Sequence, residues 1–346
     1  MGLDIAEQPD VLAGLLADGR DEIDAVARQI RARSPRFVLL IARGTSDHAA
    51  LYAKYLLEIR LGLPVGLASP STLTVYGSRP DLRDVLAIAI SQSGGSPDLV
   101  GSLQAARECG AHTVAVTNYA SSALAELAHA HVDVRAGHER AIAATKTYTA
   151  ELLALYLLLE ATREGSAAGA MSAAQDIPGL AADLLVSSAP TVTTIAPRYR
   201  FAERMIVTGR GYSYPTARET ALKLMETCYL SAQAFSGADL LHGPLAVVDQ
   251  EMPVITVIPP CRGGEAMAPV VERLVAGGGD VLFVGGSPAA GAEGRGAARI
   301  ALPVVAEELS PLLEILPMQL LSRDLAVLRG GNPDAPRGLR KVTETW

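Results

Sequence analysis

The stretch Phe37-Val-Leu-Leu-Ile-Ala42 runs directly into Arg43-Gly-Thr-Ser46, and this strand-to-turn junction decides the fold. The apolar run is typical of a buried strand, and the glycine and hydroxyl residues predict a turn into the helical pattern of residues 52–58. The same order recurs where Arg204-Met-Ile-Val-Thr-Gly209 is followed by Arg210-Gly-Tyr-Ser213. The chain is therefore predicted to repeat one structural unit.

A second pair of stretches supports this repeat. Val85-Leu-Ala-Ile-Ala-Ile90 leads into Ser91-Gln-Ser-Gly-Gly-Ser96, and Pro253-Val-Ile-Thr-Val-Ile258 leads towards Cys261-Arg-Gly-Gly264. Further strands are predicted at 113–116 and 281–284. Nearly continuous apolar strands are buried on both faces, which favours parallel sheets flanked by helices. We expect an α/β chain with two doubly wound parallel sheets, each a flavodoxin-like or Rossmann-like three-layer sandwich, and a C-terminal tail.

Composition shifts along the chain predict its domain boundaries. Residues 1–34 should form amphipathic helices that pack on a partner subunit or on the chain's own first domain. The first sheet domain should span 35–165 and the second 199–330, joined by connecting helices at 166–198. The helix-breaking run Gly330-Gly-Asn-Pro-Asp-Ala-Pro336 predicts that residues 331–346 form a tail that closes the site.

Overall composition excludes several classes of protein. The chain has 346 residues, 49% of them apolar, and a formal net charge of -7, which argues against general nucleic-acid affinity. Its three scattered cysteines, Cys109, Cys228 and Cys261, indicate a reducing compartment rather than a disulfide framework. The longest apolar run, Leu152 to Leu159, is too short to cross a bilayer. We expect a soluble cytoplasmic protein.

Chemically capable residues gather in Ala221-Leu-Lys-Leu-Met-Glu-Thr-Cys-Tyr-Leu230 and Asp239-Leu-Leu-His-Gly-Pro244. Lys223 and Glu226 are three residues apart, so a helix places them on one face. With His242 they supply a cation, a carboxylate and an imidazole, which are groups that move protons in enzymes. An ordinary helix ion pair followed by a loop histidine fits the same spacing, so both interpretations stay open here.

Glycine and hydroxyl residues occupy the turns after two predicted strands. Gly44-Thr-Ser46 and Ser91-Gln-Ser-Gly-Gly-Ser96 each precede a helix, whose first backbone amides lack partners. Parallel sheets bind ligands at the carboxyl ends of their strands, so these turns suit a phosphate. Helix capping alone explains the same residue types. Neither a Walker lysine pattern nor a dinucleotide glycine fingerprint is present, which favours a sugar phosphate over a nucleotide.

Taken together, these motifs resemble the sugar isomerase (SIS) family. The chain is similar in particular to the isomerase half of glutamine–fructose-6-phosphate aminotransferase and to stand-alone amino-sugar-phosphate deaminase/isomerases. The resemblance runs from about Phe37 to the C-terminus. It is carried by the two turns above, by Glu139 through Ala144-Thr-Lys146, by the block from Gly209 to Pro244, and by the tail Pro336-Arg-Gly-Leu-Arg-Lys341.

The resemblance implies a role for each motif residue. Glu226 would form the enediol, His242 would open the sugar ring from across a subunit interface, and Lys223 would stabilise developing negative charge. Lys341 would approach the substrate carbonyl, although without the resemblance a solvated tail lysine would be the better interpretation. Contacts to the sugar are implied for Glu139, Ala143 and Ala144. Phosphate contacts are implied for Gly44, Thr45, Ser46, Ser91, Gln92, Ser93 and Ser96. A homodimer with a shared active site is likewise implied.

Some positions depart from the family pattern. Ala144 stands where the aminotransferase has serine, Asp239 replaces a glutamate, and Gly338-Leu-Arg340 replaces Asn-Leu-Ala. No cysteine follows Met1, and the first strand is predicted to begin already at about Phe37. Glutamine-dependent synthesis is therefore not expected of this chain.

Three functions remain open at this level. The first is deamination and isomerisation of a hexosamine 6-phosphate resembling glucosamine 6-phosphate, by enediol or enamine proton transfer. The second is dehydration of an N-acetylhexosamine 6-phosphate by β-elimination on the same site. The third is a sugar-phosphate sensor without turnover. The chemistry needs no cofactor and no metal, and we expect neither a nucleic acid nor a membrane as partner.

Overall fold

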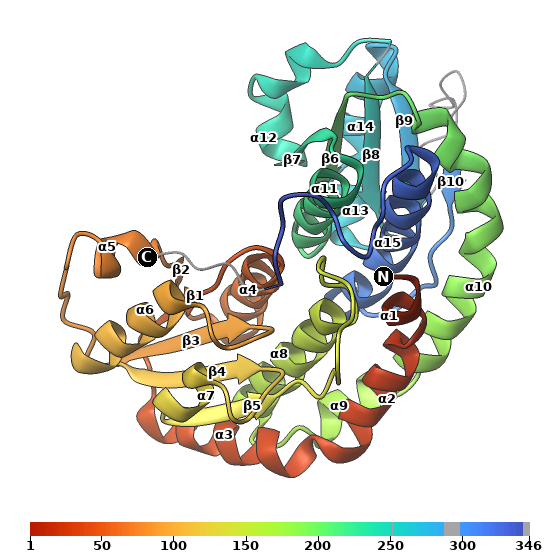
Figure 1. Ribbon diagram of the computed structural model, residues 1–346. Helices are drawn as coiled ribbons and strands as arrows, with labels where there is room; N and C mark the ends of the chain where they lie inside the picture. Colours follow the sequence, from red (N-terminus) through yellow and green to blue (C-terminus); the bar gives the residue numbers. More distant parts are fainter. Residues whose placement is uncertain (251, 287–297, 342–346) are drawn as a thin grey trace. The chain divides into compact units, whose positions relative to one another are not determined.

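The computed structural model describes residues 1–250, 252–286 and 298–341, and within them ten strands form two parallel sheets of five strands each (Figure 1). The first sheet has the order β2-β1-β3-β4-β5, and the second, read from its other edge, the order β7-β6-β8-β9-β10. The strands are β1 (Phe37–Ile41), β2 (Val65–Leu67), β3 (Val85–Ser91), β4 (His112–Thr117), β5 (Ala130–Asp133), β6 (Arg204–Gly209), β7 (Ser231–Ser236), β8 (Pro253–Ile258), β9 (Asp280–Gly285) and β10 (Ala298–Ile300).

Both sheets have the same winding. In each, the chain passes from the first strand to one neighbour and then returns to the other side of that first strand, which is the flavodoxin-like order. Residues of β3 and β8 are almost all buried because helices cover both faces of the sheets. The predicted fold class is confirmed, and the six predicted strands differ from the observed ones by only one or two residues at their ends.

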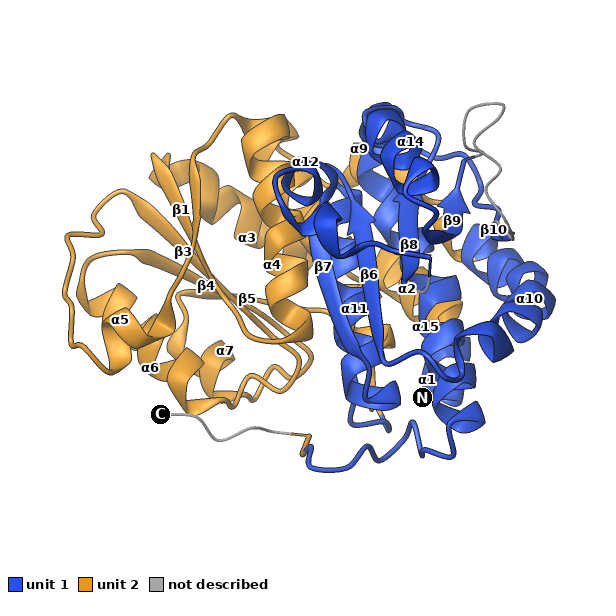
Figure 2. Cartoon of the chain, turned by 90° about the horizontal axis from the view of Figure 1, so that it is seen from above, with its two compact units in different colours: residues 1–6, 140–143, 179–339 blue, residues 7–139, 144–178, 340–346 orange. Residues whose placement is uncertain are grey.

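Residue contacts divide the chain into two compact units, named as in Figure 2. Unit 1 contains residues 1–6, 140–143 and 179–339, and unit 2 contains 7–139, 144–178 and the tail from residue 340. Each unit holds one sheet. The N-terminal helical segment is divided between the units, because its first turn packs against the last long helix and its remainder packs against the sheet of unit 2.

Unit 2 is built around α8, whose first sixteen residues are buried. The N-terminal helices α2 and α3 pack on α8, so they cover the chain's own first sheet domain. In α3 the buried residues recur at helical spacing, at Ile23, Val26, Ala27 and Ile30. The helices of this unit are α2 (Gln8–Asp18), α3 (Arg20–Arg33), α4 (Thr45–Leu56), the π-helix η1 (Leu57–Leu61), α5 (Pro70–Thr74), α6 (Pro97–Glu108), α7 (Ala123–Leu127), α8 (Lys146–Glu164) and α9 (Ala168–Ala174).

Unit 1 repeats this plan around α15, which packs against α11. Its helices are α1 (Gly2–Ala6), α10 (Ile177–Ile195, which enters from unit 2), η2 (Ala196–Tyr199), α11 (Ser213–Cys228), α12 (Gly237–Leu241), η3 (Pro244–Val247), α13 (Arg262–Glu265), α14 (Ala268–Ala276), η4 (Glu307–Leu309) and α15 (Ser310–Leu328).

Each unit has a buried serine–glutamate contact between the helix that follows its first strand and its long buried helix. Ser46, in the first turn of α4, donates to Glu151 of α8 at 2.8 Å. Ser213, in the first turn of α11, donates to Glu314 of α15 at 2.8 Å. In both units this contact ties the helix after the first strand to the long helix behind it, which supports the repeat read from the sequence.

Glu314 is fully buried among hydroxyl groups. Its oxygens accept hydrogen bonds from Ser213, from Thr216 at 2.7 Å and from Ser310 at 2.6 Å. Burial raises the pKa of Glu314, and the three hydroxyl donors only partly offset this effect. The carboxyl group is thus held in a setting that favours its neutral form.

The stretch from Ala168 to Tyr199 is long and apolar enough, by length and composition alone, to span a bilayer. The same length and composition occur in core helices of soluble proteins. In the structure this stretch comprises α9, α10 and η2, and 33% of its most apolar window is buried within the protein. This helical stretch overlaps residues 166–198, where the sequence analysis expects connecting helices.

Candidate active site

The turns after β1 and β3 lie at one edge of the sheet of unit 2. The two strands are parallel neighbours, with Ile41 opposite Ala89, so both turns leave the same side. This edge is also the point where the strand order reverses, which is where doubly wound sheets bind ligands. The structure therefore brings the two predicted phosphate turns together, and their binding of phosphate remains a prediction.

The turn after β3 depends on Gly94, which has a φ of +62°. A Cβ atom at this position would lie 2.3 Å from the Ser122 hydroxyl oxygen, so no other residue fits without displacement. The hydroxyl of Ser91 accepts the Gly94 amide at 3.2 Å, and that of Ser93 accepts the Gly95 amide at 3.3 Å. These bonds fold the turn back on itself and shape its backbone.

Two twelve-residue helices start from these turns. Their N-cap residues are Gly44 for α4 and Ser96 for α6, and neither caps its helix with a side-chain hydrogen bond. Helix N-termini of this kind attract anions through their first amides and their dipole. The Ser46 hydroxyl is turned inward to Glu151, so it serves packing in this structure. The half-buried turn side chains are Thr45, Gln92, Ser93 and Ser96.

An arginine that the sequence analysis missed stands at the same edge. Nε of Arg43 donates to Oδ2 of the buried Asp98 at 2.8 Å, while the rest of the Arg43 side chain remains largely exposed. An exposed guanidinium suits a phosphate, because it offers several donors in one plane. The signal in the sequence was the position of Arg43 directly between the strand and Gly44.

At the equivalent edge of unit 1, a carboxylate of the chain contacts one of the turns. Oε1 of Glu307 accepts the Gly263 amide at 2.8 Å, in the turn that follows β8. A Cβ atom on Gly263 would lie 3.0 Å from that oxygen and 2.8 Å from the carbonyl oxygen of Arg210 in the turn after β6. Each sheet thus has a pair of turns at this edge, and in unit 1 the carboxylate of Glu307 already contacts one of them.

The predicted cation and carboxylate meet on one face of α11. Nζ of Lys223 lies 2.5 Å from Oε2 of Glu226 and 3.4 Å from Oε1 of Glu219. The side chains of Lys223 and Glu219 are 1% and 0% exposed, whereas that of Glu226 is 22% exposed. Burial lowers the pKa of Lys223, but the two carboxylates outweigh it and the pKa is raised overall. Lys223 therefore stays charged, and Glu226 is the member of the cluster that reaches solvent.

Cys228 sits beside this cluster without reactive character. Its thiol donates to the carbonyl of Ser322 at 3.2 Å, and burial raises its pKa to about 11. A thiol with such a pKa is almost entirely protonated at neutral pH, so Cys228 acts as a small buried residue.

His242 follows α12 and is exposed. Helix α12 is fixed by Ser236, which accepts the Asp239 amide at 3.3 Å and donates to its carboxylate at 2.8 Å. In the part of the chain that the structure describes, the imidazole of His242 makes no hydrogen bond, so it does not join Lys223 and Glu226. Its predicted role in ring opening stays a prediction.

Glu139 caps helix α8 in this structure. It is 1% exposed, and its oxygens accept hydrogen bonds from the amides of Thr145 at 2.7 Å, Lys146 at 3.1 Å and Thr147 at 3.0 Å, and from the Thr145 hydroxyl at 2.8 Å. A carboxylate at a helix N-terminus is stabilised by these donors and by the dipole. The sugar contacts implied for Glu139, Ala143 and Ala144 are left as predictions, with Ala143 buried and Ala144 half-buried.

The start of the tail is fixed to the end of α11. The guanidinium of Arg337 lies over the Tyr229 ring at 4.1 Å, and the Arg337 amide donates to the Tyr229 hydroxyl at 2.9 Å. Tyr229 ends α11 in the left-handed conformation, one turn after Glu226. Lys341 is the last described residue of the tail; it is half-buried and groups with unit 2.

No metal-binding arrangement accompanies these residues. Over 1–250, 252–286 and 298–341, no group of three or more histidine, cysteine, aspartate or glutamate side chains is placed to hold an ion. Of the predicted catalytic residues, the structure brings Lys223 and Glu226 together and adds Glu219 to them.

Comparison with known proteins gives a consistent result. Residues 33–161 and 199–329 match the SIS domain family. Glutamine–fructose-6-phosphate aminotransferase [isomerizing] of Aquifex aeolicus is 33% identical over 340 residues, which are 98% of this chain and 56% of that protein. The chain thus spans about half the length of the curated relatives it matches.

Two solved structures extend the comparison. A candidate phosphosugar isomerase from Silicibacter pomeroyi DSS-3 is 33% identical, with a TM-score of 0.83 over 96% of this chain and 98% of that one. The C-terminal domain of glucosamine-fructose-6-phosphate aminotransferase from Francisella tularensis is 26% identical, with a TM-score of 0.87 over 96% of this chain and 97% of that one.

Proposed function

Because the chain belongs to the SIS domain family, we propose that it is an enzyme that deaminates and isomerises a hexosamine 6-phosphate such as glucosamine 6-phosphate. The observation that carries the proposal is the Lys223–Glu226 pair. It places a charged lysine against a carboxylate that is still 22% exposed and so available to a substrate. The names of the related aminotransferases include fructose 6-phosphate, which supports a six-carbon amino-sugar substrate.

The 6-phosphate is assigned to the edge of unit 2. Backbone amides at the starts of α4 and α6, the hydroxyls of Thr45, Ser93 and Ser96, and the amide of Gln92 supply uncharged donors. The guanidinium of Arg43 supplies positive charge at the same edge. In unit 1, Glu307 contacts the matching turn, which favours a single phosphate position per chain.

Ring opening is assigned to His242. Its exposed imidazole has no hydrogen-bond partner in the described structure, so it is free to carry a proton between the ring oxygen and the C1 hydroxyl. We propose that it acts in the site of a partner subunit of a homodimer. The reaction is placed in the cytoplasm, in keeping with three free cysteines.

Proton transfer follows from the geometry of α11. In the open-chain aldose, the C1 carbonyl acidifies the hydrogen on C2, which bears the amine. Glu226 removes that proton, and the electron pair forms a C1–C2 enaminol whose oxygen is stabilised by Lys223. Glu226 returns the proton to C1, which gives a C2 imine. Water adds to the imine and ammonia leaves, so the product is fructose 6-phosphate. Lys341 is assigned to the carbonyl end of the substrate or to closure of the tail.

The alanine at position 144 is compatible with a second reaction, the dehydration of an N-acetylated substrate. A small, half-buried side chain where the aminotransferase has serine leaves more room near the amine. If the substrate were N-acetylated, the amide would be a poor leaving group, and loss of the C3 hydroxyl as water would follow proton removal at C2. A non-catalytic sensor is disfavoured, because it has no use for a partly exposed carboxylate held beside the buried Lys223.

The purified full chain tests the proposal directly. Incubated with glucosamine 6-phosphate alone, it should release ammonia and fructose 6-phosphate in equal amounts, and Glu226→Gln should lower kcat by at least about a hundredfold. Glu272→Gln, an exposed glutamate of α14, is the matched control and should retain activity. An ultraviolet-absorbing product from N-acetylglucosamine 6-phosphate would instead support dehydration. Binding of both sugars without turnover of either would establish the sensor.

A further inference from the structure

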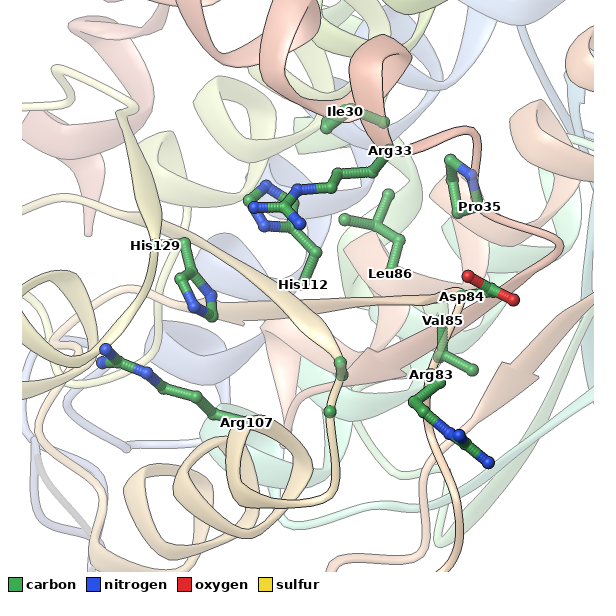
Figure 3. A pocket seen from close by; sticks show the side chains of 12 residues that line it. Ile30, Arg33, Pro35, Arg83, Asp84, Val85, Leu86, Arg107, His112 and His129 are labelled. Carbon is green, nitrogen blue, oxygen red and sulfur yellow. The ribbon is translucent and has the colours of Figure 1, made fainter.

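A cavity opens at the amino ends of β3 and β4 in unit 2 (Figure 3). Its volume is about 420 Å³, which suits a small metabolite. It is lined by Arg33 at the end of α3, Arg107 at the end of α6, and His112 and His129. The predicted phosphate turns lie at the carboxyl ends of β1 and β3. Since β3 has seven residues, the two places are about 20 Å apart, too far for one small ligand to reach both.

The two histidines present hydrogen-bonding groups that the protein does not use. Their rings stack with centroids 5.1 Å apart and planes inclined by 26°. Nδ1 of His129 accepts the Thr113 amide at 3.1 Å, so a neutral His129 carries its proton on Nε2 and is a donor there. Nε2 of His112 is buried and has no hydrogen-bond partner among the described residues.

Positive charge surrounds these rings. Arg33 makes no hydrogen bond or ion pair within the described part of the chain, and Arg107 donates one hydrogen bond, to the carbonyl of Leu127 at 2.5 Å. Figure 3 shows Arg33, His112, His129 and Arg107 on one side of the cavity, with Arg83 pointing away from them.

The remaining charges of the cavity wall are nearly balanced. Arg83 is paired with Asp81, with its Nε 2.9 Å from Oδ1, and Asp84 contributes one carboxylate on the far side from the histidines. The histidine side is therefore a positive patch on a chain whose formal net charge is -7.

We propose that this cavity is a binding site for a phosphomonoester dianion, separate from the catalytic site. The guanidinium groups of Arg33 and Arg107 and the Nε2–H of His129 would donate to the phosphate oxygens.

The electrostatic setting of the two imidazoles supports this site. Burial lowers the pKa of His112, with further lowering by the charges of His129 and Arg33. Burial likewise lowers the pKa of His129, with further lowering by Arg107 and Arg33. A bound dianion reverses the sign of the local field, so both pKa values should rise on binding. Arg33 acts on both rings and Arg107 acts on His129, while Asp84 lines the opposite wall of the cavity.

Imidazole NMR provides the test, because the chain has only six histidines. The full protein is titrated with inorganic phosphate and then with glycerol 2-phosphate at constant ionic strength. The His112 and His129 signals should shift in a saturable way, with an apparent Kd in the range of about 0.1–5 mM. The Arg33→Gln/Arg107→Gln variant should weaken binding at least about tenfold while its kcat/KM for the enzymatic reaction stays unchanged. Arg83→Gln, whose guanidinium is already paired, is the matched control and should bind within about twofold of the wild type.

Three results would overturn the site. One is a linear shift without saturation, which would indicate ionic screening. Another is saturable binding that survives the double substitution. A third is saturation by inorganic phosphate with no response to the ester, which would restrict the cavity to the free ion. The readout is binding at two histidines outside the α11 cluster, so the proposed enzymatic activity can fail without affecting it, and the reverse also holds.

Discussion

Replacement of Lys223 by methionine tests whether the α11 cluster is held together by charge. The substitution keeps the length of the side chain and removes its ammonium group, which leaves Glu219 buried at 0% exposure without its cation. Breaking a buried ion pair in this way costs about 3–5 kcal/mol. For a domain of this size, that loss lowers Tm by about 10 °C.

A second substitution separates stability from catalysis. In Lys223→Met/Glu219→Gln the buried charge is gone from both partners, so most of the lost stability should return. Activity should not return, because Lys223 is proposed to stabilise the enaminol oxygen. Lys54→Met is the control, since Lys54 pairs with Glu58 on the surface at 29% and 39% exposure and should cost at most about 1 kcal/mol.

The assay is urea unfolding followed by circular dichroism, repeated across pH. The folded-state pKa of Lys223 is raised, so its contribution is fully present below the unfolded pKa of about 10.4 and is lost only as pH rises through the folded value. The difference in the free energy of unfolding between wild type and Lys223→Met should thus be constant from about pH 7 to pH 10. A single variant as stable as the wild type, or a double variant no more stable than the single one, would refute the reasoning.

Three further predictions concern other parts of the structure. Gly94→Ala should lower affinity for the sugar phosphate at least about tenfold in calorimetry, because its Cβ meets Ser122 at 2.3 Å and the turn must move; unchanged affinity would contradict a role for this turn. Burial raises the pKa of Glu314, so the wild type loses stability as pH rises from the unfolded pKa to the folded one. Glu314→Gln should remove that loss, and its stability relative to wild type should improve in thermal unfolding as pH rises above the unfolded pKa of about 4.3; a pH-independent difference would argue against it. Tyr229→Leu removes both contacts to Arg337 and should speed proteolysis of the tail by at least about threefold, whereas an equal cleavage rate would show that the tail is held elsewhere.

The fold was largely predictable because its signals are local. The apolar runs that became β1, β3, β6 and β8 are followed by Gly/Ser turns, and each run with its turn is readable within about twelve residues. The repeat of these runs predicted two similar sheets. The sequence did not predict that residues 1–6 belong to the unit of the second sheet. That assignment depends on the packing of α1 against α15, which is distant in the sequence.

The candidate site was predictable only in part, for the same reason. Lys223 and Glu226 are three residues apart, so helical geometry alone brings them together. Glu219 had an equally local signal, at four residues from Lys223, and was overlooked. In contrast, Glu307 reaches Gly263 across 44 residues, and no pattern in the sequence indicates that pairing.

For some polar residues, the structure shows hydrogen-bond partners that the family resemblance did not predict. Ser46 and Glu139 stand in motifs associated with ligand binding, yet their side-chain oxygens are engaged by α8. Arg43 is engaged by Asp98 but stays exposed at the phosphate edge. Such assignments depend on which helix packs against each turn, which is decided by tertiary structure.

Proton transfer by Glu226 is most directly tested by deuterium exchange. Wild type and Glu226→Gln are incubated with glucosamine 6-phosphate in deuterated buffer, and the sugar phosphates are analysed by mass spectrometry and NMR. The wild type should place deuterium on C1 of the ketose product and on C2 of recovered substrate, whereas the variant should bind the sugar and leave both carbons unlabelled. Labelling by Glu226→Gln at the wild-type rate would mean that another group moves the proton.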